Sequence, residues 1–206
     1  MNKRSGIESK KRILSAALKV FSRHGYADAS IREIAKASGL SIGGVYLYFK
    51  NKEELYLSLI KERISEKNRR AEKIVGSEGP PAEKLSALIE MHLDHAMKNK
   101  GLILIHIKEH AFSFGSDIRK EYFQRQISTI ADIIKEGINI GEFRKCDVRE
   151  TAKLIMSAIR GIVLSMAIED EKFITAKGLN RLLMHGLLKN NYNRPEGIKQ
   201  IKRIKR

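Results

Sequence analysis

Hydrophobic residues recur every three to four positions along most of the chain, and charged residues fill the positions between them. This spacing is typical of helices that bury one face. No two alternating runs of β-branched residues are joined by a hairpin turn, so we predict an all-α fold. The predicted helices cover residues 6 to 24, 31 to 38, 42 to 48, 51 to 75, 81 to 98, 101 to 113, 117 to 139, 148 to 169 and 173 to 190.

Capping residues and glycines mark the ends of several of these helices. Ser30, Asn51 and Asp147 are each followed three residues later by Glu, a pattern that satisfies free N–H groups at a helix start. Gly25 and Gly39 follow the first and second helices and supply the left-handed conformation that often ends a helix. We divide the chain into a three-helix unit over 1–52, a larger helical domain over 53–190 and a basic tail over 191–206.

The stretch SIGGVYLYF at residues 41 to 49 carries two adjacent glycines inside the third predicted helix. Each glycine costs about 1 kcal/mol relative to alanine in a helix interior, so we expect another surface to approach the backbone there. Two short helices joined by a glycine-containing turn form the pattern of a helix-turn-helix unit, whose second helix enters the DNA major groove by its N-terminal end. We therefore interpret Gly43 and Gly44 as facing DNA, with the hydroxyls of Tyr46 and Tyr48 able to reach phosphates. Alternatively, the glycines let the third helix pack against the first.

The positive charge of the chain is concentrated near its two ends. The formal net charge is +16, and residues 1–52 hold eleven Lys and Arg against three Asp and Glu. Residues 189–206 hold seven against one, while the long segment between has a net charge of only +2. This distribution is expected where a polyanion such as DNA binds locally. A non-specific basic DNA-binding protein, the alternative, would spread its charge over the whole surface.

Cysteine usage and hydropathy indicate the compartment. Cys146 is the only cysteine, which excludes an intramolecular disulfide and a cysteine-rich zinc site. A reducing cytoplasm is therefore the expected location. The first residues carry no apolar stretch behind their charges, and the apolar runs are shorter than a membrane span. We expect a soluble protein without a membrane partner and without a cofactor.

Residues 11 to 55, KRILSAALKVFSRHGYADASIREIAKASGLSIGGVYLYFKNKEEL, resemble the DNA-binding domain of the TetR family of bacterial transcriptional regulators. The matching features are ILSAALKVFSRHGY, SIREIA, SGLS, the glycine-containing helix that ends in YLYF, and KNKEEL. The resemblance implies a homodimer that reads two half-sites of a near-palindromic operator in double-stranded DNA. It also implies a C-terminal helical domain that dimerises and holds a small-molecule effector. The predicted function is that of a repressor released from its operator by a small hydrophobic ligand.

Positions that contact DNA in this family carry over to individual residues of this sequence. They are Ser30, Ser41, Ile42, Gly43, Gly44, Tyr46, Tyr48 and Lys52. Ile42 stands where a basic residue or proline is common, and Gly44 stands where Thr, Ser or Ala is common. Ile42 is able to touch a thymine methyl group. Further contacts are expected from Arg32 and Leu47, and phosphate contacts from Lys10 and Lys11.

In the family, the helices that follow the DNA-binding domain enclose the effector. The candidate lining residues here are Met91, His92, His95, His106, His110, Phe112, Tyr122 and Phe123. Apolar and aromatic residues with a few polar ones suit a largely hydrophobic molecule, although ordinary core residues would show the same composition. A multidrug-like cation, a fatty acyl compound and a metabolite all remain open.

The last two long helices carry apolar stripes at helical spacing. The resemblance favours a four-helix seam between two copies of the chain, although the core of a single chain would also produce such stripes. The candidate interface residues are Ile155, Met156, Ile159, Val163, Leu179, Leu182, Leu183, Gly186 and Leu187.

The histidines allow one further alternative, a metal-dependent helical enzyme. His106 and His110 stand four residues apart, a spacing that can place two metal ligands on one helix face. A third ligand could come from His92 or His95, but the sequence does not fix one. No nucleophile elbow, phosphate loop or paired-carboxylate setting accompanies these histidines. We therefore predict a regulator that is not an enzyme.

Overall fold

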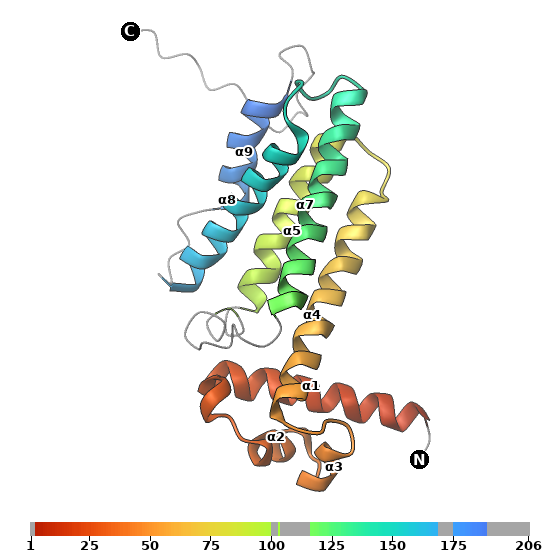
Figure 1. The fold of residues 1–206 in the computed structure, drawn as a ribbon, viewed down its shortest axis with the longest axis vertical. Coiled ribbons are helices and arrows are strands. Elements are labelled where there is room, and N and C mark those ends of the chain that lie inside the picture. Colours follow the sequence, from red (N-terminus) through yellow and green to blue (C-terminus); the bar gives the residue numbers. More distant parts are fainter. Residues whose placement is uncertain (1–2, 100–102, 104–115, 169–174, 189–206) are drawn as a thin grey trace.

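The computed structural model describes residues 3–99, 103, 116–168 and 175–188 of the chain. This part is built of helices (Figure 1). Their order is α1 (Lys3–Asp28), α2 (Ile31–Ser38), α3 (Ile42–Tyr46), α4 (Lys52–Val75), α5 (Pro81–Lys98), α7 (Ser116–Asn139), α8 (Val148–Ile168) and α9 (Ala176–Leu187). The all-α prediction is confirmed. The predicted helix over 101–113, apart from Ile103, and the predicted basic tail over 191–206 lie outside the described residues.

Capping groups explain where the first helices begin and end. Ser30 and Glu33 form the expected reciprocal capping box, in which the Ser30 hydroxyl oxygen accepts from the Glu33 N–H at 3.2 Å. Gly39 ends α2 in the left-handed conformation, with φ at 68°. Gly25 also has a positive φ, 83°, but it kinks α1 without ending it. The chain therefore makes one further helical turn to Asp28, beyond the end that the sequence predicted.

The first of two hydrophobic cores holds the N-terminal helices together. α1, α2 and α3 lie across the lower end of the molecule in Figure 1, beside the start of α4. Phe21 and Tyr56 meet edge to face, with ring centroids 5.4 Å apart, an arrangement that adds to the gain from burial. The core also contains Ile13, Ala17, Ile34, Val45, Phe49, Leu55 and Leu59.

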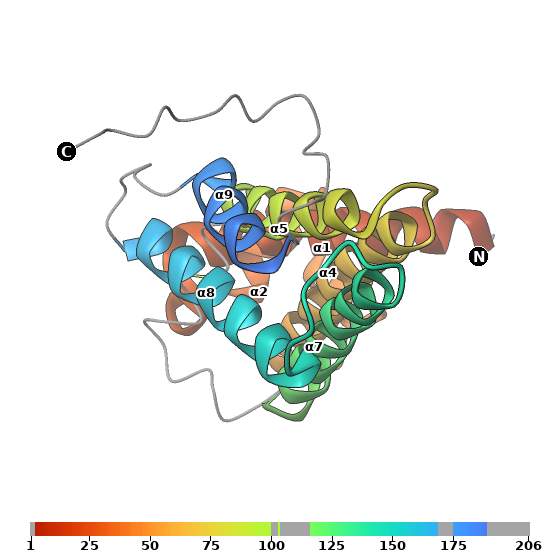
Figure 2. The same cartoon turned by 90° about the horizontal axis from the view of Figure 1, so that it is seen from above.

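The second core lies among α5, α7, α8 and α9. Figures 1 and 2 show these helices packed side by side, with α7 against α5 and α8, and α9 against α5. Its fully buried residues come from the inner faces of these helices and include Leu85, Leu88, Ile89, Ile130, Ile133, Ile134, Ile155 and Ile159. This bundle forms a body distinct from the core around α1.

Helix α4 belongs to both cores and joins them. Leu55 and Ile60 near its start are buried in the first core, and Ala71 near its end is buried in the second. Helix α4 is therefore a continuous connection between the two cores. The predicted domain boundary after residue 52 falls at the first residue of α4, whereas the first core continues to Ile60.

The turn after α7 ties one end of the bundle together. Phe143 is fully buried, and its N–H donates to the carbonyl of Gly137 at 2.9 Å. Glu142 is also buried, with both carboxylate oxygens 3.4 Å from the N–H of Ala82. Pro80 has no side-chain cap to offer at that end of α5, so Glu142 supplies an acceptor for a free N–H group there.

Replacing Gly137 by alanine is expected to destabilise the chain by about 2 kcal/mol or more, because overpacking displaces a buried ring. A Cβ at this position would lie 2.6 Å from Cε2 of Phe143. Gly161→Ala is the matched control, because a Cβ there meets no atom within 4 Å. Urea denaturation of both variants measures the difference. A Gly137→Ala chain as stable as wild type would show that the Phe143 ring moves aside without cost.

Helix α8 is long and apolar enough to cross a membrane by length and composition alone. This differs from the prediction, which rested on uninterrupted apolar runs that are shorter than a membrane span. One side of α8 packs on α5 and α7, and 33% of its most apolar window is buried inside the chain. Leu154, Leu164 and Ile168 are exposed on it. The side of α8 that packs on α5 and α7 is part of the core of the chain. The exposed apolar residues of α8 are available to contact another surface.

Candidate functional site

Helix α3 presents an exposed end at the lower edge of the molecule (Figure 1). Ser41 is its N-cap, and the Ser41 hydroxyl accepts from the N–H of Gly44 at 3.0 Å. Val45 is fully buried and fixes the inner side of the helix. Leu47 is 77% exposed and Tyr46 is 49% exposed. Exposed apolar and phenolic groups beside a free helix end suit insertion into a DNA groove.

The two glycines of α3 are not needed for packing within the chain. A Cβ built on Gly43 meets no atom within 4 Å. One built on Gly44 meets only its neighbours Ser41, at 3.2 Å, and Leu40, at 3.6 Å. The alternative in which these glycines let α3 pack against α1 is therefore excluded. The bare backbone of α3 faces outward, where a partner can approach it closely.

The other predicted DNA-contact residues differ in how much they are exposed. The Ser30 hydroxyl is engaged in the cap of α2, where it donates to the Glu33 carboxylate at 2.9 Å. Tyr48 is half-buried. The Nζ of Lys10 lies 5.6 Å from the centre of the Phe49 ring, although most of its side chain is exposed. The exposed residues of the set are Lys10, Lys11, Arg32, Ser41, Ile42, Gly43, Tyr46 and Leu47.

Lys52, a predicted phosphate contact, has a structural role in the DNA-free chain. Its Nζ donates to the carbonyls of Tyr26, Ala27 and Ala29 at 2.7, 2.9 and 3.0 Å. It also lies 4.6 Å from the centre of the Tyr26 ring. An ammonium group has three N–H donors, and all three are used here. Lys52 therefore ties the start of α4 to the end of α1, and its contact with DNA stays a prediction.

Lys52→Met is expected to lower the free energy of unfolding by about 1–3 kcal/mol, because three carbonyls lose a charged donor. Lys50→Met is the control, since the Lys50 side chain is exposed two residues away. Thermal unfolding followed by circular dichroism compares the two. Equal melting temperatures would contradict the structural role of Lys52.

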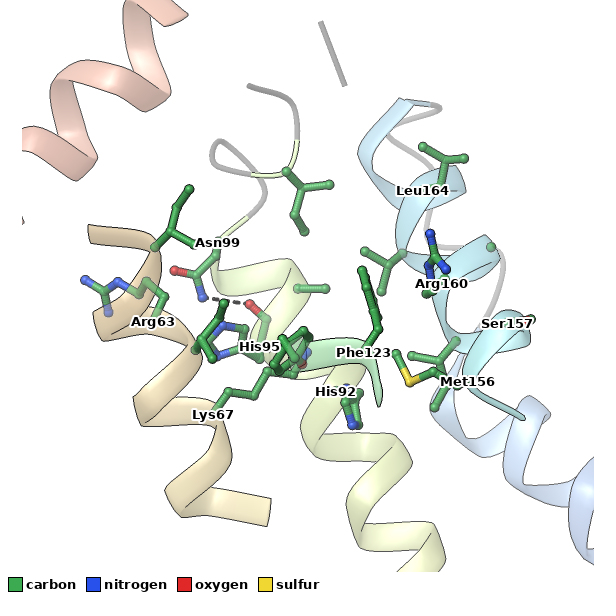
Figure 3. A pocket seen from close by; sticks show the side chains of 18 residues that line it. Arg63, Lys67, His92, His95, Asn99, Phe123, Met156, Ser157, Arg160 and Leu164 are labelled. Atoms are coloured by element: carbon green, nitrogen blue, oxygen red, sulfur yellow. Dashed lines mark hydrogen bonds between the residues drawn. The ribbon is translucent and has the colours of Figure 1, made fainter. Parts of the chain in front are cut away.

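A cavity of about 660 Å³ opens between α4, α5, α7 and α8 (Figure 3). Its size falls within the range of small-molecule sites. Most of its lining is apolar and consists of Ile60, Ile64, Ala96, Ile103, Phe123, Met156, Ile159, Gly161, Val163 and Leu164. The polar lining residues are Arg63, Lys67, His92, His95, Asn99, Tyr122, Ser157 and Arg160. Within the described part of the chain, this lining contains basic residues but no Asp or Glu.

The cavity brings together half of the predicted effector residues. His92, His95, Tyr122 and Phe123 line it. Met91 is buried but lies outside the lining. The other three predicted residues, His106, His110 and Phe112, lie outside the described residues.

The sequence analysis missed the cationic lining residues Arg63, Lys67 and Arg160. Arg63 and Lys67 stand in a segment whose charged residues look like a solvated face, whereas Arg160 is the single charged residue between residues 154 and 168, and no motif marks any of the three. Figure 3 shows Arg63 and Lys67 on α4 and Arg160 on α8, on opposite sides of the cavity. Their position around one cavity depends on the packing of both α4 and α8 against α5 and α7, which local pattern does not encode.

Burial changes the titration of the polar lining residues. It lowers the pKa of His92 far below the usual range, and that of His95 to about 4. Both imidazoles are therefore neutral near pH 7. Burial raises the pKa of the Tyr122 phenol, so it too is neutral. For Lys67, burial lowers the pKa to about 8.

No metal centre forms among the described residues, where no three His, Cys, Asp or Glu side chains come together. His92 and His95 are neutral and three residues apart on α5. The lining offers hydrogen-bond donors, the amine of Lys67 and the guanidinium groups of Arg63 and Arg160 in a largely apolar enclosure. This arrangement suits the binding of an amphipathic molecule.

The candidate interface residues divide between the inside and the outside of the bundle. Ile155, Met156, Ile159, Leu179 and Leu187 are buried in the core of the chain itself, so they do not lie on an outer face. Val163 and Leu183 are half-buried, and Leu182 and Gly186 are exposed. The exposed apolar residues that the prediction missed are Leu154, Leu164 and Ile168.

Two family signatures match the chain, together over more than half of its length. The description "Bacterial regulatory proteins, tetR family" matches residues 13–59. The description "Tetracyclin repressor-like, C-terminal domain" matches residues 78–164. The chain belongs to the TetR family. It is a ligand-responsive, DNA-binding transcriptional regulator, as the resemblance of residues 11 to 55 implied.

Similar TetR-family proteins match the chain over most of its length. The fatty acid metabolism regulator protein of Bacillus subtilis is 28% identical over 165 residues, which cover 78% of this chain and 84% of that protein. The solved structure of the regulator FadR from Bacillus subtilis in complex with stearoyl-CoA is 28% identical, with a TM-score of 0.73 over 85% of this chain and 98% of that one. The fatty acid degradation regulator FadR from Bacillus halodurans is 27% identical, with a TM-score of 0.71 over 86% and 98% of the two chains.

Proposed function

We propose that this TetR-family chain is a repressor that binds a palindromic operator as a homodimer and leaves it when a long-chain fatty acyl compound enters the cavity. The composition of the cavity lining is the main observation that supports this class of ligand. The lining is mostly apolar, contains basic groups and, among the described residues, has no carboxylate. A cationic drug would meet the positive charge of Lys67, which has no ion pair among the described residues, and would find no carboxylate in the described lining to pair with. The similarity to a FadR solved with stearoyl-CoA supports the same class.

The operator would be read mainly by the exposed end of α3. Gly43 and Gly44 allow the backbone to approach the base edges, and Tyr46 and Leu47 flank it. Lys10 and Lys11 on α1 would meet phosphates. A DNA-binding regulator works where the DNA is, which supports a location in the bacterial cytoplasm.

The homodimer would use the exposed apolar residues of the last two helices. Leu154, Leu164 and Ile168 on α8 and Leu182 on α9 are 44–71% exposed. Burying such residues against a second copy would remove them from water. Two copies would then present two α3 helices to half-sites separated by one turn of DNA, about 34–36 Å.

Ligand and operator would be coupled through α4. Ile60, Arg63, Ile64 and Lys67 of α4 line the cavity, and the start of the same helix lies in the core that holds α3. A ligand that pushes α4 would change the spacing of the two α3 helices in the dimer. A ligand that binds the released state about 100-fold more tightly would supply roughly 2.7 kcal/mol of coupling.

Fluorescence anisotropy on an operator selected from random duplexes tests this function. Palmitate, palmitoyl-CoA and hexadecyltrimethylammonium are added separately, each below its micelle concentration, while circular dichroism verifies that the chain stays folded. At least one of the two acyl compounds is expected to weaken operator binding about 100-fold, and the cation is expected to have no effect. Release by the cation alone would contradict the proposed ligand class.

A further inference from the structure

Polar side chains from three helices line one part of the cavity wall, and two of them, His92 and Tyr122, have polar atoms without a hydrogen-bond partner among the described residues. His92 of α5 is fully buried, and neither ring nitrogen makes a hydrogen bond of good geometry among the described residues, although the lowering of its pKa by burial is slightly opposed by the nearby Gln126 side chain. The hydroxyl of Tyr122 on α7 is buried and also unpartnered. The Nζ of Lys67 on α4 lies 5.4 Å from the centre of the Tyr122 ring. Buried polar groups in native proteins are nearly always hydrogen bonded, so this cluster points to a missing partner.

The other cations of the lining have charged or aromatic partners in the chain, although the buried Nε of Arg63 has no hydrogen bond among the described residues. Arg63 pairs with the Glu66 carboxylate at 3.0 Å, and the guanidinium of Arg160 lies 4.3 Å from the centre of the Phe123 ring. Lys67 has no ion pair within the described part of the chain, and the cause of its lowered pKa is burial alone. Lys67 is therefore the lining cation with which a bound anion would form an ion pair. In Figure 3 its side chain extends from α4 toward His92 and His95 of α5.

We propose that Lys67, His92 and Tyr122 form a recognition site for a free carboxylate, so that the effector is an unesterified long-chain carboxylic acid whose chain fills the apolar part of the cavity. This inference rests on the proposed function, because it assumes an acyl ligand in the same cavity. It goes further by assigning the ligand's head group and the residues that bind it.

The donors of the cluster match a carboxylate better than a thioester. A carboxylate brings a full negative charge and accepts up to about four hydrogen bonds. The cluster offers the ammonium of Lys67, the phenol O–H of Tyr122 and one N–H of neutral His92. A thioester carbonyl brings no charge and would leave the Lys67 ammonium uncompensated in a largely apolar enclosure. Hydrogen bonds to charged groups are also the stronger ones.

Ligand binding to the full-length chain tests the assignment. Displacement of a fluorescent apolar probe gives the affinities of tetradecanoic acid, 1-tetradecanol and tetradecanoyl-CoA, which share one chain length. Wild type is expected to bind the acid about 10- to 100-fold more tightly than the alcohol, the range for one charged hydrogen bond. Lys67→Met should bring this ratio close to 1 and leave the affinity for the alcohol unchanged.

Two further variants make the result specific. Lys61→Met removes an exposed lysine from the same helix and should keep the wild-type ratio. Tyr122→Phe removes the hydroxyl alone and should lower the affinity for the acid several-fold, which provides a readout even if Lys67→Met fails to fold.

The possible outcomes separate the head-group assignment from the proposed function. An acid-to-alcohol ratio that is unchanged in folded Lys67→Met would overturn the carboxylate site. Binding and operator release by tetradecanoyl-CoA, without either by the acid, would also overturn it while leaving the acyl-responsive repressor intact. Failure of all three compounds to bind or to release operator would overturn both.

Discussion

An alanine at position 43 is expected to weaken operator binding about 100-fold while the folded chain becomes no less stable. A Cβ at Gly43 meets nothing within 4 Å in the chain, and alanine favours a helix over glycine by up to about 1 kcal/mol. Against DNA, the added methyl group would occupy the gap between the α3 backbone and the groove. Losing one contact costs about 1–3 kcal/mol, and a symmetric dimer loses it twice.

Anisotropy at fixed salt measures the operator affinity of Gly43→Ala, and urea denaturation measures its stability. Gly161→Ala, another helical glycine with open space around its Cβ position, is the control and should bind operator like wild type without ligand. If Gly43→Ala keeps the wild-type affinity, α3 does not approach DNA by this end.

Lys67→Met is expected to stabilise the ligand-free chain by about 1–3 kcal/mol at pH 7. Burial lowers the pKa of Lys67 to about 8, from 10.5, so the folded chain holds a charge in an unfavourable setting. Methionine keeps a similar helix propensity and fills apolar space. Binding sites often contain residues that reduce the stability of the fold because function requires them. A destabilising lysine that lines a cavity fits this pattern.

The stability gain from Lys67→Met should depend on pH in a defined direction. Below pH 8 the Lys67 amine is protonated in both the folded and the unfolded wild-type chain, so the folded chain is destabilised by the full free energy of burying that charge. Between pH 8 and about 10 the unfolded chain binds more protons, so wild-type stability rises toward that of Lys67→Met. His92, His95 and Tyr122, which surround Lys67, stay neutral over this range because burial shifts their pKa values away from it.

Urea denaturation at pH 7, 8, 9 and 10 measures this pH dependence as the difference between Lys67→Met and wild type. Lys61→Met is the control and should show no such trend, because that side chain is exposed. A loss of stability in Lys67→Met that is constant with pH would mean that Lys67 has a favourable partner in the folded chain.

Local features of the sequence predicted most of the fold. Ser30 and Gly39 set the ends of α2 through their own side chain and backbone, so the helix-turn-helix unit could be recognised without knowledge of long-range contacts. The prediction for Gly25 was only partly correct. Its positive φ was expected, but the chain then makes a further helical turn up to Asp28, where the distant Lys52 ammonium donates to the carbonyls of Tyr26 and Ala27.

The parts of the site that the sequence did not predict depend on contacts between distant helices. Lys52 lies beside an exposed helix start in the sequence, and only the fold brings it to the carbonyls 23 to 26 residues earlier. Lys67 lies among other charged residues of α4 in the sequence. It lines the cavity only because α5 and α7 pack against α4. Ile155 and Ile159 lie on the side of α8 that its own chain covers, which periodicity alone does not distinguish from an outer face.

Coupling between the cavity and the operator is tested most directly by a nuclease footprint of the full-length chain on the DNA upstream of its own gene, recorded at increasing tetradecanoic acid. We expect a protected site with two-fold symmetry, and we expect the protection to disappear as the cavity fills. Equal protection of random DNA would contradict sequence-specific regulation. Protection that persists after probe displacement shows the cavity to be full would contradict the coupling of ligand binding to operator release.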